Sequence, residues 1–173
     1  MSPAVPETAA GLAETSQPVS LWLRRATLTG FALVVVASAL ALLGVRTSTA
    51  SADGGGYHVG VEHPAVARAG LDTVWQVTVR RDSPLEKELE LAVTGDYFDL
   101  FETQAFHPEP TESSRDGDTL YLTFTTSPGS DTFVVAYDAY IQPSAQRGRD
   151  GSVSVVVDGD PVATARFATH LVP

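Results

Sequence analysis

The chain has 173 residues, no cysteine and a formal net charge of −10, and these properties exclude several classes of protein. Without cysteine there are no disulfides, thiolate metal sites, iron–sulfur clusters or cysteine nucleophiles. Nucleic-acid binding needs basic surface to neutralise phosphates, so the acidic balance argues against a nucleic-acid partner. We therefore expect one globular domain that is held together by its apolar core alone.

The N-terminal part of the chain predicts a cytoplasmic tail followed by a membrane span. Residues 1–25 begin with a run rich in Pro, Ala, Ser, Thr and Glu, which cannot bury enough surface to fold. Residues 26–45 are uncharged and apolar, and such a length of helix reaches about 30 Å, the thickness of the hydrocarbon core. Arg24 and Arg25 precede this run and only Arg46 follows it. The positive-inside rule then places the N-terminus in the cytoplasm and the C-terminal part outside the cell membrane.

A cleaved secretory signal is the competing interpretation of the same segment. A charged stretch, an apolar stretch and the small residues Ala50, Ser51 and Ala52 follow one another in the expected order. The apolar stretch is longer than the usual ~7–15 residues of a signal, and Arg46 interrupts the approach to the cleavage site. An anchor is favoured, and a twin-Arg export signal is a lesser version of the alternative. All three interpretations export the C-terminal domain.

Four small residues recur along the predicted span at spacings of seven, four and three: Gly30, Ala37, Ala41 and Gly44. A face of small side chains lets two helices approach closely in lipid. We expect this face to be a candidate contact with a partner helix or with a second copy of the chain.

The rest of the chain predicts a flexible linker and then a domain of short strands. Residues 46–56 are small, polar and Gly-rich, which is typical of a linker. From residue 57 onward apolar residues alternate with polar ones, which predicts half-buried strands. The clearest strands lie near residues 75–79, 89–93, 120–124, 133–141, 153–157 and 162–169, with weaker candidates at 57–61 and 97–101.

About seven or eight strands are predicted for residues 57–173, and no segment has a helical period. Asp158-Gly159 lies between two strands, which predicts a tight antiparallel hairpin. This pattern favours an all-β fold, an antiparallel β-sandwich like those of immunoglobulin and fibronectin-III domains, preceded by one transmembrane helix. Trp75 lies on an apolar strand face and is expected to be a core residue.

Several segments of this domain carry a resemblance. They are AGLDTVWQVTVRR, TGDYFDLFE, HPEPTE, TFVVAYDAYIQP and VDGDPVATARFATHLVP. Together they resemble a group of small bacterial single-pass membrane proteins with an exported immunoglobulin-like domain and no assigned activity. The resemblance covers about the last hundred residues. It implies the plan of one membrane helix and one exported domain, and it transfers no catalytic residue.

Two segments are candidate partner-binding sites. Tyr97 and Phe98 lie in an aromatic and acidic segment that would suit a cationic or carbohydrate ligand, although a strand whose rings fill the core is the favoured interpretation. Arg147 and Arg149 lie in the one basic loop of an acidic domain, where they either dock an acidic partner or balance local charge. Exposure of both rings would favour binding, and burial of both would not.

No pattern predicts a cofactor or a metal. The Asp-Gly-Asp segments at 116–118 and 158–160 lack the further oxygens that calcium needs, and the four histidines have no zinc spacing. The pair Glu109 and Glu112 is too common an arrangement to carry acid–base hydrolysis. We therefore expect a membrane-anchored, non-enzymatic binding or accessory module, with a membrane protein or a second copy as candidate partner. A cell-envelope hydrolase, a ligand-sensing domain and a cleaved secreted protein are the alternatives.

Overall fold

The computed structural model describes residues 18–39, 44–102 and 105–172, which divide into the units Met1–Leu43 and Gly44–Pro173. In the first unit, α1 spans Pro18–Ala39, a length of about 33 Å at 1.5 Å per residue. Its stretch Leu21–Ser38 is long and apolar enough to cross a membrane.

The limits of the helix differ from the predicted span. Residues 18–25 were expected in the tail but belong to α1, because proline is compatible with a first helical turn and no further proline or glycine follows it before residue 26. Residues 1–17 and 40–43 lie outside the described residues. Gly44 and Val45 are not helical, and Val45 packs against the core of the second unit.

The second unit contains ten strands and one short 3₁₀ helix among its described residues. Their bounds are β1 Arg46–Gly54, β2 Tyr57–Ala67, β3 Asp72–Arg81, β4 Glu88–Thr94, η1 Gly95–Leu100, β5 Phe106–His107, β6 Glu112–Asp116, β7 Thr119–Thr125, β8 Thr132–Tyr140, β9 Arg149–Val157 and β10 Asp160–Leu171. The predicted all-β fold with one preceding helix is confirmed, with ten strands instead of seven or eight. The immunoglobulin-like type stays a prediction.

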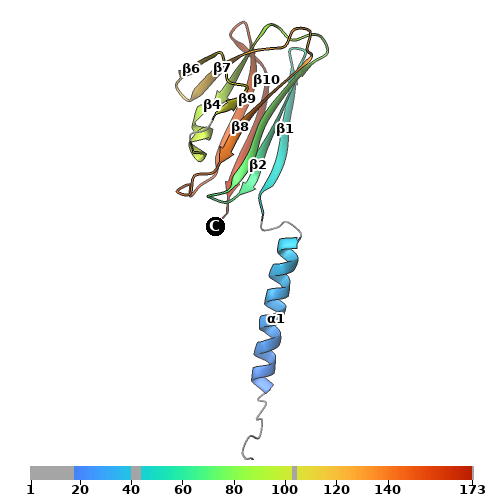
Figure 1. The fold of residues 1–173 in the computed structure, drawn as a ribbon, viewed down its shortest axis with the longest axis vertical. Helices are drawn as coiled ribbons and strands as arrows, with labels where there is room; N and C mark the ends of the chain where they lie inside the picture. The colour runs from blue at the N-terminus through green and yellow to red at the C-terminus, as the bar shows by residue number, and fades with distance from the viewer. Residues whose placement is uncertain (1–17, 40–43, 103–104, 173) are drawn as a thin grey trace, which may run out of the picture. The chain divides into compact units, whose positions relative to one another are not determined.

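The strands form one ladder in the order β5-β8-β3-β2-β10-β9-β4-β7-β6, with β1 paired to β2 beside this path. The ladder folds over at β10, as the layers in Figure 1 show. Most of β10 runs antiparallel to β9, but its end pairs in parallel with β2 through His170 and Leu171. Among the strands that the structure describes, this short parallel contact departs from the predicted antiparallel pairing. The two halves of the ladder are called here the β2 sheet (β1, β2, β3, β8, β5) and the β9 sheet (β10, β9, β4, β7, β6).

The core fills the space between the two sheets. Alternate residues of β3 and β8 are buried, as the period-two pattern predicted, and Phe124 of β7 meets Phe133 of β8 with ring centroids 5.2 Å apart. Trp75 is 1% exposed, which confirms it as a core residue. Large aromatic side chains dominate the energetics of a core such as this, which has no disulfide to support it.

The predicted linker at 46–56 is wrong. Residues 46–54 form β1, which pairs with β2 along its whole length, and Gly55 and Gly56 have φ values of 58° and 80°, as a tight two-residue hairpin turn requires. The small side chains of β1 gave no apolar alternation, because only Ala50 and Ala52 pack against the core. Backbone pairing, rather than burial of large side chains, holds this strand.

Other local expectations have mixed outcomes. The weak strand expected at 97–101 is wrong, because η1 occupies residues 95–100. The hairpin at Asp158-Gly159 is confirmed: β9 and β10 pair through it, and both turn residues have positive φ. The short edge strands β5 and β6 were not predicted, because β6 is exposed throughout and therefore lacks an apolar face.

Candidate functional site

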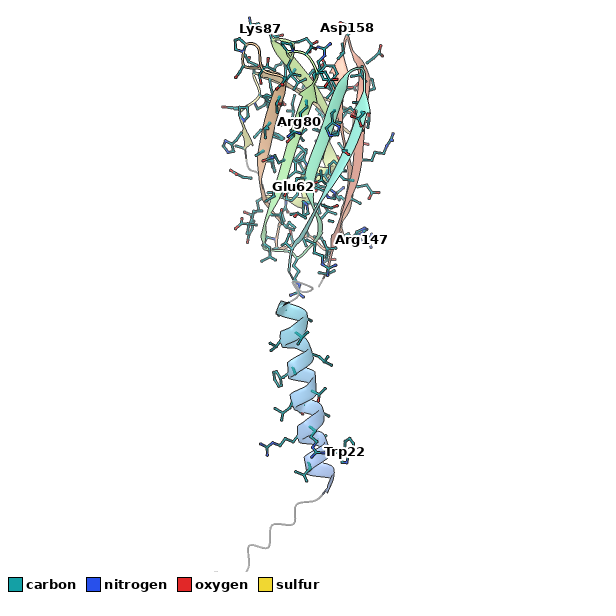
Figure 2. All side chains as sticks on the ribbon, turned by 90° about the vertical axis from the view of Figure 1, so that its right-hand side faces the viewer. Trp22, Glu62, Arg80, Lys87, Arg147 and Asp158 are labelled. Atoms are coloured by element: carbon teal, nitrogen blue, oxygen red, sulfur yellow. The ribbon has the colours of Figure 1, made fainter. Side chains whose placement is uncertain are left out.

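One outer surface of the β2 sheet collects polar side chains around an open hollow. The hollow has a volume of about 240 Å³ and is lined by Thr49, His58, Gly60, Glu62, Gln76, Thr78 and Arg80. We call these seven residues the polar face. They come from β1, β2 and β3, and Figure 2 shows Glu62 and Arg80 on the same side of the sheet.

Strand register brings these residues together. His58 lies opposite Arg80, Gly60 opposite Thr78, and Glu62 opposite Gln76 in the antiparallel pairing of β2 with β3. Since side chains at alternate positions of a strand point to the same side of a sheet, residues 58, 60 and 62 share one face. Their inward neighbours Val59 and Val61 are fully buried, which fixes which side of the strand faces out.

The Asp53 carboxylate orients the ring of His58. Its Oδ1 lies 2.7 Å from His58 Nδ1, and the two residues face each other across β1 and β2. Because Nδ1 is occupied, Nε2 is left to meet a ligand. The side chain of His58 is 46% exposed and that of Asp53 is 79% exposed, so this pair is an orienting contact more than a source of stability.

Most of the hydrogen-bonding capacity of the polar face is unused. Among the described residues, the side chains of Glu62, Gln76 and Thr78 have no hydrogen bond or ion pair with another residue. A carboxylate, an amide and a hydroxyl together offer both donors and acceptors. The surface is therefore equipped to exchange water for a polar ligand.

Gly60 opens the middle of this surface. A Cβ atom placed there would meet only the Thr78 carbonyl oxygen, at 3.9 Å, which is ordinary van der Waals contact. Glycine weakens a strand interior and often marks a place where a ligand approaches closely. Nothing in the packing around this position requires a glycine.

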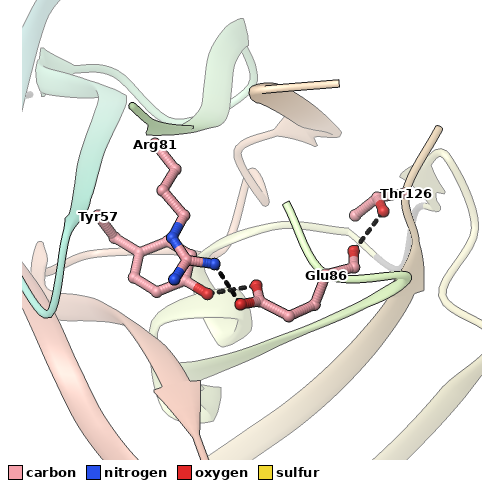
Figure 3. Close-up of polar contacts among 4 residues, drawn as sticks. All are labelled: Tyr57, Arg81, Glu86 and Thr126. Atoms are coloured by element: carbon pink, nitrogen blue, oxygen red, sulfur yellow. Dashed lines mark hydrogen bonds and ion pairs between the residues drawn. The ribbon is translucent and has the colours of Figure 1, made fainter. Parts of the chain in front are cut away.

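A second hollow of about 380 Å³ adjoins the first and shares His58 and Arg80 with it. Its wall includes Tyr57 and Arg81, which meet Glu86 in the cluster drawn in Figure 3. The Tyr57 hydroxyl donates to one Glu86 carboxylate oxygen and Arg81 donates to the other. The Arg81 guanidinium also lies 4.8 Å from the centre of the Tyr57 ring.

The electrostatics of this cluster are those of a structural clamp. Burial, reinforced by the neighbouring Glu86 carboxylate, raises the pKa of Tyr57 to about 12, so the phenol remains a donor. The same hydrogen bond holds the pKa of Glu86 below its usual value. The Glu86 backbone carbonyl accepts a bond from Thr126 Oγ1 at 2.5 Å. The clamp joins the start of β2 to the connections beyond β3 and β7, and it keeps the wall of the second hollow in place.

The structure separates the predicted site residues. Tyr97 is 1% exposed and its hydroxyl lies 2.8 Å from Thr169 Oγ1, so its interpretation as a binding residue is wrong. Phe98 is half-buried against Trp75, with ring centroids 5.1 Å apart. The rings of this segment complete the core because η1 turns them inward.

The basic loop is exposed, as expected for a binding site or for a solvated loop. Arg149 lies 3.5 Å from the Asp99 carboxylate of η1, so part of its charge is already balanced. Arg147 is exposed and has no ion pair within the described parts of the chain. Figure 2 shows Arg147 at the end of the sandwich opposite to Lys87 and Asp158, away from the second hollow.

The proposed helix face is only partly described. Gly30 and Ala37 lie in α1, Ala41 lies outside the described residues, and Gly44 is not part of the helix. Gly44 is therefore withdrawn from the candidate contact. Association of α1 through Gly30 and Ala37 stays a prediction.

Sequence reasoning did not find the polar face. The alternating pattern predicts only that the polar residues of β2 and β3 face outward, and β1 has no such pattern to indicate a strand. The one local signal was Gly60 between Val59 and Val61, in a stretch that otherwise favours a strand.

Across the residues that the structure describes, no group of three or more His, Asp or Glu is placed to hold a metal ion. The two Asp-Gly-Asp segments occupy hairpin turns between β6 and β7 and between β9 and β10. A scan against models of known protein families finds no match, and a comparison with curated proteins finds none either.

Proposed function

We propose that this chain is a single-pass membrane protein that presents a non-catalytic binding or accessory domain outside the membrane. The stretch Leu21–Ser38 has the length and composition of a span. Arg24 and Arg25 lie near the N-terminal end of that stretch, with only Arg46 after it, and this favours a cytoplasmic N-terminus under the positive-inside rule. The strand-rich unit from Gly44 onward is then extracytoplasmic, and its polar face is the binding surface.

The observation that carries the proposal is the unused hydrogen-bonding capacity of the polar face. Glu62, Gln76 and Thr78 project from strands whose backbones are already paired, so they lose little backbone freedom when a ligand binds. A preordered surface of this kind binds with a smaller entropic cost than a mobile loop. The hollow that it lines and the adjoining second hollow are open and lined mainly by polar residues, which suits a binding surface better than an enclosed reaction site.

Site-specific crosslinking tests this proposal in native membranes. A photoreactive phenylalanine derivative replaces Thr78 on the polar face, and the same derivative replaces Tyr121 as a matched control. Tyr121 is also half-buried and lines a hollow on the outer surface of the β9 sheet. We expect a discrete adduct from position 78 and none from position 121. Equal adducts, or none from either position, would contradict the binding role of this face.

The mass of the mature chain tests the membrane anchor separately. We expect the intact chain, including Pro18–Ala39, in the membrane fraction. A shortened chain that begins near Asp53 in the medium would identify a cleaved secreted protein instead.

A further inference from the structure

We infer that the polar face binds a carbohydrate chain, with one sugar residue seated in the hollow over Gly60. This inference rests on the proposed binding function and names its ligand class. The packing of the fold does not explain why residue 60 is a glycine.

Gly60 lies in the interior of β2, between the buried Val59 and Val61. Its backbone does not adopt a positive φ, and a Cβ would meet no atom closer than 3.9 Å. Most side chains would therefore fit, and a β-branched residue would favour the strand. The absence of a side chain lowers strand stability but leaves the centre of the polar face open. A ligand that approaches β2 at Gly60 would account both for the loss of strand stability and for the open centre of the polar face.

The side chains around Gly60 match a ligand with many hydroxyl groups. Glu62, Gln76 and Arg80 each end in a planar group that presents two polar atoms side by side. Such groups can engage two neighbouring hydroxyls of one sugar ring. Thr49 and Thr78 add single hydroxyls to the lining of the hollow. Because these residues lie on three adjacent strands, the contacts extend across the sheet and suit a chain of sugars.

The charge of the polar face disfavours the other ligand classes. Glu62 and Arg80 carry opposite charges, with Asp53 and His58 paired beside them, so neither a polyanion nor a polycation is matched. A protein partner usually places aromatic or large apolar side chains at the centre of its interface. The seven residues of the polar face include no aromatic ring other than the His58 imidazole and no aliphatic residue, and the exposed Val134, opposite Thr78 on β8, lies outside the hollow. A neutral polyhydroxylated chain fits this combination better.

The test uses the full-length chain in lipid nanodiscs and four neutral probes, namely maltohexaose, xylohexaose, mannohexaose and hexa-N-acetylchitohexaose. Saturation-transfer NMR detects the sugar protons that contact the protein and gives the apparent affinity. Two variants separate the hollow from general effects. Gly60→Val fills the hollow, and Ala92→Val adds a β-branched side chain to an outward position of β4 in the β9 sheet.

We expect at least one hexaose to bind the wild-type chain, and Gly60→Val to weaken it at least about tenfold while the thermal midpoint is unchanged or raised. The control Ala92→Val should keep the wild-type affinity for the hexaose. Glu62→Gln, on the polar face, should lose part of that affinity. If Gly60→Val and the wild type bind the hexaose with equal affinity, the sugar does not bind in the hollow over Gly60 and the inference is wrong. If no hexaose binds while the photoreactive group at position 78 captures a protein, the carbohydrate inference fails and the binding function stands. If neither occurs, both fail.

Discussion

The same substitution, glycine to alanine, is expected to have opposite effects at two positions of the β1–β2 hairpin. At Gly54 a Cβ would lie 1.9 Å from the backbone carbonyl oxygen of Val162 and 3.0 Å from its carbonyl carbon. At Gly60 the nearest atom would be 3.9 Å away. Gly54→Ala therefore tests whether β1 packs against β10, and Gly60→Ala tests whether the hollow is free of structural constraint.

The magnitudes follow from these distances. Real Cβ atoms essentially never approach another heavy atom within 3.0 Å, so β1 and β10 must separate by about 1.1 Å in Gly54→Ala. Overpacking of this kind costs about 1–3 kcal/mol, and the upper part of that range applies because the obstacle is backbone. About 2–3 kcal/mol lowers the thermal midpoint of a domain this size by about 7–11 °C. Gly60→Ala instead gains about 0.5–1 kcal/mol, or about 2–4 °C.

The assay is thermal unfolding of the full chain in detergent, followed by tryptophan emission. The chain has two tryptophans, and a Trp22→Phe background leaves the buried Trp75 as the sole reporter. A Gly54→Ala chain that melts within about 2 °C of its parent would refute the packing of β1 on β10 and restore the linker interpretation. A Gly60→Ala chain that melts well below its parent would show that the fold requires this glycine.

Three further predictions concern buried or clamped polar groups. Tyr97→Phe should lower the free energy of unfolding by about 1–3 kcal/mol, because it leaves the buried Thr169 hydroxyl without a partner. The double variant that also carries Thr169→Val should regain part of that free energy, as measured by urea unfolding. Burial lowers the pKa of His63 from 6.5, so the unfolded chain binds more protons than the folded chain, and stability falls as the pH drops below about 6.5. The thermal midpoint of His63→Leu should therefore change less than that of the wild type between pH 7 and about pH 5. The lowered pKa of Glu86 contributes stability above pH 4.5 that is lost on acidification, so the midpoints of Glu86→Gln and wild type should differ at pH 7, and this difference should shrink as the pH falls below 4.5. A constant difference down to pH 3 would contradict the clamp.

The parts of the fold that were predictable are those where large apolar residues alternate along the chain. Strands β3, β4, β8 and β9 have this pattern, and Asp158-Gly159 identified their last hairpin because its turn requires positive φ. Strand β1 was not predicted, because backbone pairing with β2 stabilises it without large buried side chains. Hydrophobic periodicity does not report on such a strand.

The candidate site was harder to predict than the fold for a related reason. Exposed polar residues on a strand have the same pattern whether they bind a ligand or only water, so Glu62 and Gln76 were not distinguishable from other outward residues. The aromatic segment at Tyr97 was more conspicuous, but its rings are needed to close the core. Only long-range register, which places residues 49, 62 and 76 side by side, reveals the polar face.

The most direct test of the proposed function is cysteine labelling in intact cells. The chain has no native cysteine, so Thr78→Cys and Tyr121→Cys each provide a single thiol, on the polar face and on the β9 sheet. A membrane-impermeant maleimide is applied, and each rate is divided by the rate for the purified protein. We predict rapid labelling at position 121 and marked protection at position 78, because the domain is outside the membrane and its polar face is occupied. No labelling at either position would contradict the exported orientation, and equal labelling at both would contradict the binding face.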